Sequence, residues 1–354
     1  MPKTINLADS RRVRILGGRP TGLMKRLAIV MPVLDDWASF AMLVEEIART
    51  SFTDAEWVEI VAVDDGSADI IDPGAISLPE GGCVRGVRIV HLALNLGHQR
   101  AIATGLVSLI GRKDLDGVIV MDSDGEDRPQ EIPVLLDACR AHPGRVVLAR
   151  RAERSESAIF RIGYKVYKLM FRLSTGRGIS FGNYAVLPMD AVRRLVHMPE
   201  LWNNLPAAIM RSRLPYLTVD TIRGSRYSGQ SRMNFASLII HGLSAMSVYT
   251  DLIFIRVLLM ASAVSALAFV AIFAVLAVRL GTTLAIPGWA TTVFGDLVII
   301  LFQAILTIVA TSLMVLAGRS ARPTVPKTDA QTFIRAVSEL FPARQATERT
   351  AKGP

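Results

Sequence analysis

The sequence has few of the residues that build a disulfide framework or a thiolate metal site. Among 354 residues there are only two cysteines, Cys83 and Cys139, and five histidines. Neither residue type shows the spacing of metal ligands, so none of these side chains is expected to bind a metal. The two thiols are expected to be ordinary side chains in a reducing compartment. No internal repeat is found either.

Residues 1–25 lack the apolar stretch that follows the basic residues of a secretory signal. They are predicted to form a basic N-terminal arm that either lies on anionic headgroups or is simply disordered. The whole chain carries a formal charge of +9, which suits nucleic acid, a phosphorylated substrate or an anionic bilayer. Because the basic residues cluster beside long apolar segments, the bilayer is favoured and nucleic-acid binding is not expected.

Apolar residues make up 51% of the chain, which is high for a purely soluble protein. Two runs without a charged residue, 257–278 and 297–318, are each about 33 Å long as helices, enough to cross a bilayer. We therefore expect an interfacial amphipathic helix over 233–254, two transmembrane helices within 255–318, and a basic tail over 319–354. The positive-inside rule predicts a two-pass protein of the inner (cytoplasmic) membrane, with the N-terminal domain and the tail cytoplasmic.

Short apolar runs alternate with helical patterns before these spans. The runs predict buried strands at 27–34, 58–63, 86–92, 117–121 and 145–149. Helical spacing lies between them at 38–50, 100–109 and 132–141. This alternation predicts an α/β domain over 26–232 with a mostly parallel sheet. In such sheets ligands bind beyond the C-terminal ends of the strands.

An acidic turn, VMDSDGEDRP at 120–129, follows the fourth predicted strand. Asp122 and Asp124 are two positions apart, so they share one face of an extended chain. Two carboxylates at the end of a strand suit Mg²⁺ or Mn²⁺, with a substrate phosphate completing the coordination. The alternative is a turn that caps the next helix. Two roles remain open for Asp127: it is either a helix cap before Pro129 or a part of the donor pocket.

A second acidic turn, Asp64 and Asp65, follows the second predicted strand. Its carboxylates can accept hydrogen bonds from a base or from ribose hydroxyls, although Asp-Gly-Ser is equally good turn chemistry. Residues 95–105, NLGHQRAIATG, place small residues at a helix start, where free N–H groups attract phosphate and Arg100 adds charge. Close packing of this helix on the sheet is the alternative explanation for the small residues.

A third segment, RGSRYSGQSR at 223–232, combines arginines with glycine and serine. Glycines give a flexible loop, and arginines give forked donors that match phosphate. A positive stripe on the membrane surface is the alternative. Because the loop directly precedes the expected interfacial helix, it can meet a soluble nucleotide on one side and a lipid phosphate on the other.

The segments MPVL, VDDGS, NLGHQRAIATG, MDSDGEDRP and RGSRYSGQSR occur in the order found in glycosyltransferase family 2. Over about residues 26–318 the chain resembles the polyprenyl-phosphate glycosyltransferases, which include the dolichyl-phosphate mannose synthases. The resemblance implies a GT-A (Rossmann-like) fold, a UDP- or GDP-sugar donor, a divalent metal and inversion at the anomeric carbon. It also implies a membrane-bound phosphate acceptor such as polyprenyl phosphate, and it is compatible with a homo-oligomer formed through the membrane helices.

The resemblance also implies roles for individual residues. The contacts to the nucleotide-sugar fall on Pro32, Asp64, Asp65, Asn95, Arg100 and Asp122. The metal ligands are Asp122 and Asp124. The acceptor phosphate falls to Arg151, Arg223, Arg226, Ser231 and Arg232, with Arg154 as a further basic residue after the fifth strand. The catalytic residues are Asp124, Arg226 and Arg232.

The chain departs from the family pattern in three places. The loop 32–36 reads Pro-Val-Leu-Asp-Asp where relatives have P-x-Y-N-E, so an aromatic contact near the base is not expected. Arg232 replaces a lysine of the loop. Asn183 stands where bacterial members usually have aspartate, and an amide cannot remove a proton from a hydroxyl acceptor. A phosphate acceptor is already ionised at neutral pH and needs no such base.

The predicted function is therefore a membrane-bound inverting glycosyltransferase that moves a sugar to a polyprenyl-phosphate carrier. One alternative is a glycosyltransferase with a hydroxyl acceptor on a glycolipid or polysaccharide, although the Q-x-x-R-W motif of the processive synthases is absent. The other is a non-catalytic membrane scaffold that retains the fold, for which Asn183 and the altered loop 32–36 are the argument.

Overall fold

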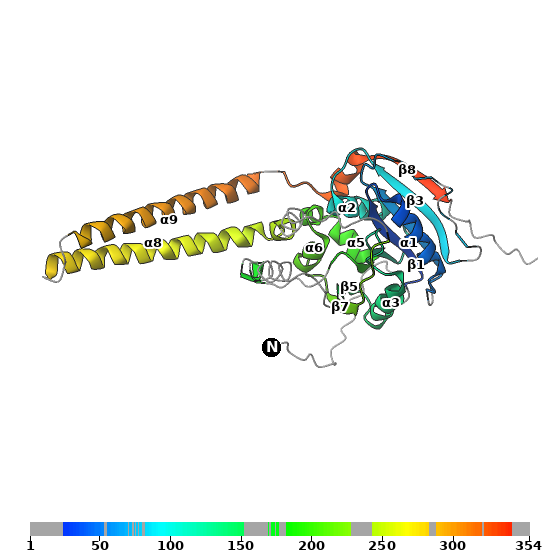
Figure 1. Ribbon diagram of the computed structural model, residues 1–354, viewed down its shortest axis with the longest axis horizontal. Coiled ribbons are helices and arrows are strands. Elements are labelled where there is room, and N and C mark those ends of the chain that lie inside the picture. The colour runs from blue at the N-terminus through cyan, green and yellow to red at the C-terminus, as the bar shows by residue number, and fades with distance from the viewer. Residues whose placement is uncertain are drawn as a thin grey trace, which may run out of the picture.

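The computed structural model describes most of the chain between residues 24 and 341. The described residues are 24–52, 55–69, 71, 72, 74, 76, 78, 79, 82–151, 169, 171–173, 175, 176, 182–227, 243–282, 288–320 and 322–341. They form an α/β unit built on one sheet and a hairpin of two long helices that projects from it (Figure 1).

The sheet has eight strands in the order β7-β5-β6-β4-β1-β2-β3-β8. The strands are β1 (Arg26–Val33), β2 (Trp57–Asp64), β3 (Val84–Leu92), β4 (Gly117–Val120), β5 (Val146–Arg151), β6 (Ala185–Pro188), β7 (Tyr216–Thr221) and β8 (Ile334–Phe341). Strand β1 pairs in parallel with β2 and β4, and β3 continues the parallel set beside β2. Strands β6 and β8 run antiparallel to their neighbours. The predicted α/β class with a mostly parallel sheet is confirmed.

Helices cover both faces of the sheet. The helices are α1 (Trp37–Arg49), α2 (His98–Leu109), α3 (Ile132–Ala141), α5 (Met189–Leu195) and α6 (Leu205–Arg211), with short 3-10 turns η2 (Pro129–Glu131) and η3 (Pro199–Trp202). Alternate residues of β1 enter different cores: Leu27 and Ile29 pack with α1 and α3, while Ala28 and Val30 pack with α2. Burial on both faces explains why β1 reads as one continuous apolar run.

The end of the chain corrects the expected basic tail over 319–354. After the second long helix the chain returns to the α/β unit and forms α10 (Pro326–Asp329), η4 (Ala330–Phe333) and β8. Strand β8 pairs antiparallel with β3, and His91 Nε2 lies 2.8 Å from Ser338 Oγ. The α/β unit is therefore completed by residues on both sides of the helical hairpin, and it does not end at residue 232.

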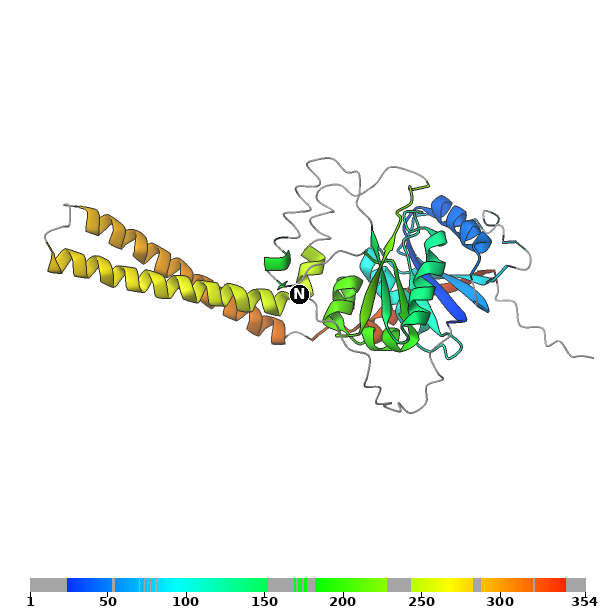
Figure 2. The same cartoon turned by 90° about the horizontal axis from the view of Figure 1, so that it is seen from below.

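The hairpin consists of α8 (Thr250–Gly281) and α9 (Trp289–Ser320), which include the two predicted apolar runs. Both helices are long and apolar enough to cross a membrane, and only 6% and 11% of their most apolar windows is buried within the chain. Buried Ala261, Ala268 and Val275 recur every seven residues on α8, as in packed antiparallel helices. Figure 2 shows the hairpin and the α/β unit at opposite ends of the long axis. An apolar surface of this extent is that of a membrane protein.

The expected boundary between the interfacial helix and the first transmembrane helix, at 254/255, is also wrong, because α8 runs through it. The helix begins at Thr250 and continues without a break through the end of the expected interfacial helix. The first part of that expected helix, 233–242, lies outside the described residues. At about 1.5 Å per residue each long helix reaches roughly 48 Å, so its ends extend beyond a hydrocarbon core of about 30 Å unless it tilts.

Candidate active site

The acidic turn after β4 lies at the carboxyl edge of the sheet, beside the end of β1. Ser123 Oγ donates to the carbonyl of Pro32 at 2.8 Å and ties the two strand ends together. The backbone N–H of Asp122 donates to Asp127 Oδ2 at 3.0 Å. The side chains of Asp122 and Asp124 keep 21% and 19% exposure on this turn. Asp127 is only 3% exposed. Its carboxylate holds the turn in shape through this bond, and neither η2 nor α3, which follow, has a side-chain cap bond.

The arginine loop packs directly on the acidic turn. Arg223 forms an ion pair with Glu126, and the N–H of Gly224 donates to the carbonyl of Glu126 at 2.9 Å. The N–H of Tyr227 donates to the carbonyl of Asp124 at 3.1 Å. Two of the predicted segments, far apart in sequence, therefore form one surface at the end of β4.

Two glycines make this close approach feasible. A Cβ on Gly125, whose φ is +88°, would lie 2.5 Å from the ring of Tyr227. A Cβ on Gly224 would lie 2.4 Å from the carbonyl oxygen of Gly125. Both distances are far below van der Waals contact, so a larger residue at 224 forces the two backbones apart, and a larger residue at 125 displaces the ring of Tyr227 from the turn.

Arg226 connects the acidic turn with the loop that follows β1. Its Nη2 lies 3.0 Å from Asp36 Oδ2, and its Nη1 lies 3.8 Å from Asp124 Oδ2. The neighbouring Asp35 links this loop to the turn after β2: its N–H donates to Ser67 Oγ at 3.0 Å, and its Oδ1 accepts the N–H of Ala68 at 2.8 Å. The altered loop 32–36 thus uses two aspartates as links, a role that the sequence analysis missed. Two adjacent aspartates after the strand were the signal.

Asp65 is buried, with 3% exposure, and it holds the turn before α2. Its two oxygens accept the N–H groups of Leu96 at 2.7 Å and Gly97 at 3.0 Å. Burial raises the pKa of Asp65, and the two N–H bonds offset part of that rise. Each oxygen retains a second lone pair, so a contact with the nucleoside stays a prediction for this residue.

Asp64 is also buried and has two partners from its own chain. It accepts the N–H of Ser67 at 2.9 Å, and its Oδ2 lies 2.9 Å from His91 Nδ1. The other nitrogen of His91 reaches Ser338 on β8. The predicted nucleoside residue is therefore connected through one imidazole to the strand that follows the hairpin. Its contact with a nucleoside likewise stays a prediction.

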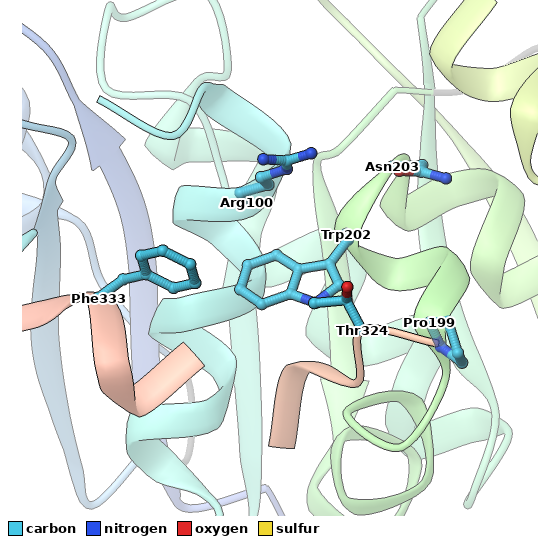
Figure 3. Close-up of a pocket in the computed structure, with 6 residues that line it drawn as sticks. All are labelled: Arg100, Pro199, Trp202, Asn203, Thr324 and Phe333. Atoms are coloured by element: carbon cyan, nitrogen blue, oxygen red, sulfur yellow. The ribbon is translucent and has the colours of Figure 1, made fainter. Parts of the chain in front are cut away.

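Asn95 and Arg100, near the start of α2, have different neighbours. Asn95 Oδ1 accepts the N–H of Gly97 at 3.0 Å, within the turn that Asp65 holds. Arg100 instead lines a hollow of about 380 Å³ (Figure 3). The rest of this lining is Pro199, Trp202, Asn203, Thr324 and Phe333. None of these residues belongs to the acidic turns, so donor binding by Arg100 stays a prediction.

At Gly105, the small side chain allows α2 to pack closely on the sheet. A Cβ there would lie 2.6 Å from Val30 Cγ1 and 2.7 Å from Val63 Cγ2. Glycine therefore lets α2 approach β1 and β2 closely. The alternative explanation of the segment 95–105, close helix–sheet packing, is confirmed at this position.

His98 is a site residue that the sequence analysis missed. Its Nε2 lies 3.2 Å from Asp122 Oδ1 and 3.0 Å from Asn183 Nδ2. Burial lowers the pKa of His98, the charge of Asp122 raises it, and the net direction is upward. No spacing in the sequence could reveal this contact, because the three residues come from α2, the acidic turn and the segment before β6.

Several predicted acceptor residues cannot be placed. Ser231, Arg232 and Arg154 lie outside the described residues. Arg151 is the last residue of β5, where its backbone pairs with Thr221, and its side chain is outside the described part. Of the predicted acceptor residues, Arg223 and Arg226 are the two whose described side chains lie against the acidic turn.

Among the described residues, no group of three or more His, Cys, Asp and Glu side chains could hold a metal ion by itself. Asp122 and Asp124 nevertheless fit the predicted ion in chemistry. They are two hard oxygen donors on one turn, without a thiolate, which suits Mg²⁺ or Mn²⁺ better than zinc. A donor set this small requires substrate phosphate oxygens and water for the remaining positions.

Comparison with known proteins finds a family model that matches part of the chain. The model of the family described as "Glycosyl transferase family 2" matches residues 28–189. An undecaprenyl-phosphate 4-deoxy-4-formamido-L-arabinose transferase of Pectobacterium carotovorum is 30% identical over 225 residues, 61% of this chain and 65% of the relative. The transferase of the same description from Photorhabdus laumondii is 27% identical over 224 residues, with the same coverage. This chain thus spans less than two thirds of the length of these relatives.

Solved structures provide a more distant likeness. Glucosyl-3-phosphoglycerate synthase from Mycobacterium tuberculosis, in complex with Mn²⁺, UDP and glucosyl-3-phosphoglycerate, is 14% identical with a TM-score of 0.46. The match covers 67% of this chain and 85% of the synthase. A likeness this distant says nothing about the ligands of the present chain.

Proposed function

From the match of residues 28–189 to the glycosyl transferase family 2 model, we propose that this chain is a membrane-bound inverting glycosyltransferase. Its donor is a UDP- or GDP-sugar and its acceptor is a polyprenyl phosphate. The observation that carries the proposal is the contact between the acidic turn and the arginine loop, with Arg226 between Asp124 and Asp36. The names of the bacterial relatives, which are undecaprenyl-phosphate sugar transferases, support the acceptor class.

Asp122 and Asp124 would hold Mg²⁺ or Mn²⁺, and the bound ion supplies positive charge that offsets the charge on the departing nucleotide diphosphate. Ser123, through its bond to Pro32, keeps this turn at the end of β1, where the donor binds in folds of this class. Asp127 fixes the backbone at Asp122. The turn is therefore held in one geometry before a ligand arrives, which is what preorganised catalysis requires.

Arg223 and Arg226 bind the acceptor phosphate on the same surface. Their guanidinium groups are paired with Glu126 and Asp36, so each can turn its remaining N–H donors toward a phosphate. A phosphate oxygen then attacks the anomeric carbon in line with the departing diphosphate. Because this oxygen is already ionised, Asn183 does not have to remove a proton. Positioning and charge stabilisation supply most of the acceleration.

The hairpin of α8 and α9 lies in the inner (cytoplasmic) membrane, with the α/β unit on the cytoplasmic side. The distribution of charge supports this orientation. The connection between the helices carries almost no positive charge, whereas Arg319 lies in the last turn of α9 and Arg322 follows the helix. A polyprenyl phosphate presents its headgroup at that same surface.

Asp124→Asn tests the proposal, with the full-length chain in membranes, labelled UDP- and GDP-sugars and polyprenyl phosphate. Loss of one carboxylate ligand is expected to lower transfer by about 100-fold or more. Asp137→Asn, at an exposed carboxylate on α3, is the matched control and should retain activity. Undiminished transfer by Asp124→Asn would contradict the metal role.

The product distinguishes the acceptor classes. Transfer to a lipid phosphate gives an acid-labile sugar phosphate, whereas transfer to a hydroxyl gives a stable glycoside. Recovery of the glycoside would favour the hydroxyl acceptor. Failure of the chain to bind any UDP- or GDP-nucleotide with Mn²⁺ in calorimetry would instead favour a non-catalytic scaffold.

A further inference from the structure

A row of polar side chains crosses one end of the sheet from β2 to β8. Asp64 and His91 stand opposite each other as the last register pair of β2 and β3, and Ser338 lies on the neighbouring β8. Two positions earlier on the same face, Ala62 and Ile89 belong to one buried core. The row is therefore the first polar layer beyond an apolar face.

The imidazole of His91 is held from both sides. Its Nδ1 lies 2.9 Å from Asp64 Oδ2, and its Nε2 lies 2.8 Å from Ser338 Oγ. The side chains of His91 and Asp64 are only 12% and 7% exposed. A carboxylate only accepts, so Nδ1 donates to Asp64, whereas a hydroxyl both donates and accepts and can pair with Nε2 in either form of the ring.

These contacts fix the rotation of the Asp64 carboxylate. The terminal torsion of an aspartate is soft and roughly two-fold, so a single bond constrains it only weakly. Asp64 has a bond at each oxygen, because Oδ1 accepts the N–H of Ser67 at 2.9 Å and Oδ2 accepts from His91. The second lone pair of each oxygen then has a fixed direction.

We propose that His91, itself held by Ser338, is a positioning residue that orients Asp64 toward the nucleoside of the donor, and that β8 is therefore part of the donor site. The nucleoside contact rests on the proposed function, whereas the fixed rotation follows from the geometry. Ser338 lies outside residues 28–189, which match the family model, and it comes after the helical hairpin. The donor site is thus complete only when the chain has returned from the hairpin to the sheet.

The orientation of Asp64 can be measured without a nucleotide through the amide of Ser67. Hydrogen exchange of this amide is followed by NMR of the full-length chain, labelled with ¹⁵N-serine, in lipid nanodiscs. The signal is identified by its absence in Ser67→Ala. His91→Phe keeps a planar ring and removes both nitrogens, so Oδ2 loses its partner and the carboxylate can turn. Exchange of the Ser67 amide is expected to become about tenfold faster.

Ser338→Ala removes only the outer contact of His91 and serves if His91→Phe does not fold. It should accelerate exchange at Ser67 by a smaller factor. Glu339→Gln, at the exposed next residue of β8, is the matched control and should leave exchange unchanged. Unchanged exchange in a folded His91→Phe would overturn the positioning role, and unchanged exchange in Ser338→Ala would remove β8 from the donor site.

The second readout is the binding of UDP and GDP with Mn²⁺ by calorimetry, together with the kinetics of sugar transfer. His91→Phe is expected to raise the Kd of the nucleotide and the KM of the nucleotide-sugar about tenfold, the order of one lost hydrogen bond to a charged group. The kcat should change little, because the lost contact binds ground state and transition state alike. His91→Asn places an amide nitrogen where Nδ1 was and should recover part of the affinity.

The outcomes separate this proposal from the proposed function. A fall in kcat with unchanged KM, or an unchanged nucleotide affinity despite faster exchange at Ser67, would overturn the link to the donor. Failure of the unaltered chain to bind either nucleotide would contradict the proposed function, and the exchange of the Ser67 amide would still decide whether His91 positions Asp64.

Discussion

Gly125 sits where the acidic turn and the arginine loop touch, and a second glycine of similar backbone conformation provides a matched control. Gly125 has φ +88° and a Cβ there meets Tyr227 at 2.5 Å, whereas Gly144 has φ +78° and open space within 4 Å. Alanine costs about 1–2 kcal/mol of stability at either position, since both lie in the left-handed region. Only Gly125→Ala also displaces the ring of Tyr227, a residue of the loop, from the turn.

We therefore expect Gly125→Ala to lower sugar transfer by about 100-fold, the cost of misplacing groups by an ångström or so. Gly144→Ala should keep most of its sugar-transfer activity. Its melting temperature should fall by about as much as that of Gly125→Ala. Transfer assays and thermal unfolding of both variants check this. Equal activities in the two variants would show that contact between the loop and the turn is not needed.

The residues that the sequence analysis located are those whose placement depends on local order. Asp122 and Asp124 follow an apolar run, so the end of a strand and a shared face can be inferred directly. The contacts of His98 and Asp36 depend instead on which segments meet in three dimensions, and no local pattern encodes that. Asp127 illustrates the limit, because its acceptor role depends on the path of the backbone between 122 and 127.

At the scale of elements, Asp116 joins the start of β1 to the start of β4. Its Oδ2 accepts the N–H of Arg26 at 3.0 Å, and its Oδ1 lies 2.7 Å from Arg26 Nη2. Burial alone would raise the pKa of Asp116. The hydrogen bonds and charge of Arg26 lower the pKa by more than burial raises it, so the pKa falls below its usual 3.8. A lowered pKa means that the folded state binds the proton less tightly than the unfolded state does.

The stability from this contact is therefore present above about pH 4 and is lost as the pH falls through the lowered pKa. Asp116→Asn is expected to reduce the free energy of unfolding by about 1–3 kcal/mol at pH 7, as for hydrogen bonds to charged groups. The difference from the unaltered chain should shrink as the pH falls below about 4. Denaturant unfolding across this range measures it, with exposed Asp190→Asn as control. A difference that does not change with pH would contradict the charge-based explanation.

The predicted elements are correct where burial on both faces makes a strand uniformly apolar. Strands β1, β2 and β4 are such cases, and their runs stand out from the flanking polar residues. The short β6, with only four residues, and β7, whose residues are mostly half-exposed or exposed, gave no clear run. Strand β8 was missed because its exposed, partly charged face resembles a tail.

At the scale of the whole molecule, the helical hairpin is joined to the α/β unit both where the chain enters the hairpin and where it leaves. On leaving the hairpin, the chain adds α10 and β8 to the unit. On entering it, Tyr249, 1% exposed, packs beside α6 with its hydroxyl 3.4 Å from the carbonyl of Ala207. Figure 1 shows both connections at the same end of the hairpin. Two connections limit how the α/β unit can rotate relative to a membrane.

The first connection contains an ion pair that can be tested separately. Arg211, the last residue of α6, binds Asp251 at the start of α8 through two bonds of 2.9 and 3.1 Å, and its Nε lies 2.8 Å from Glu200. Paired donation of this kind fixes direction as well as distance. Breaking it should loosen the α/β unit relative to the hairpin and leave the acidic turns unchanged.

Arg211→Ala is therefore expected to slow transfer to polyprenyl phosphate in membranes by about tenfold or more, because a lipid headgroup and the site no longer meet in a fixed orientation. Nucleotide binding measured by calorimetry should change little. Asp251→Asn should reproduce the effect. Arg193→Ala, which removes an arginine paired within α5, should leave both measurements unchanged. A parallel loss of nucleotide binding in Arg211→Ala would mean that the pair stabilises the α/β unit itself, and that its orientation to the membrane is set elsewhere.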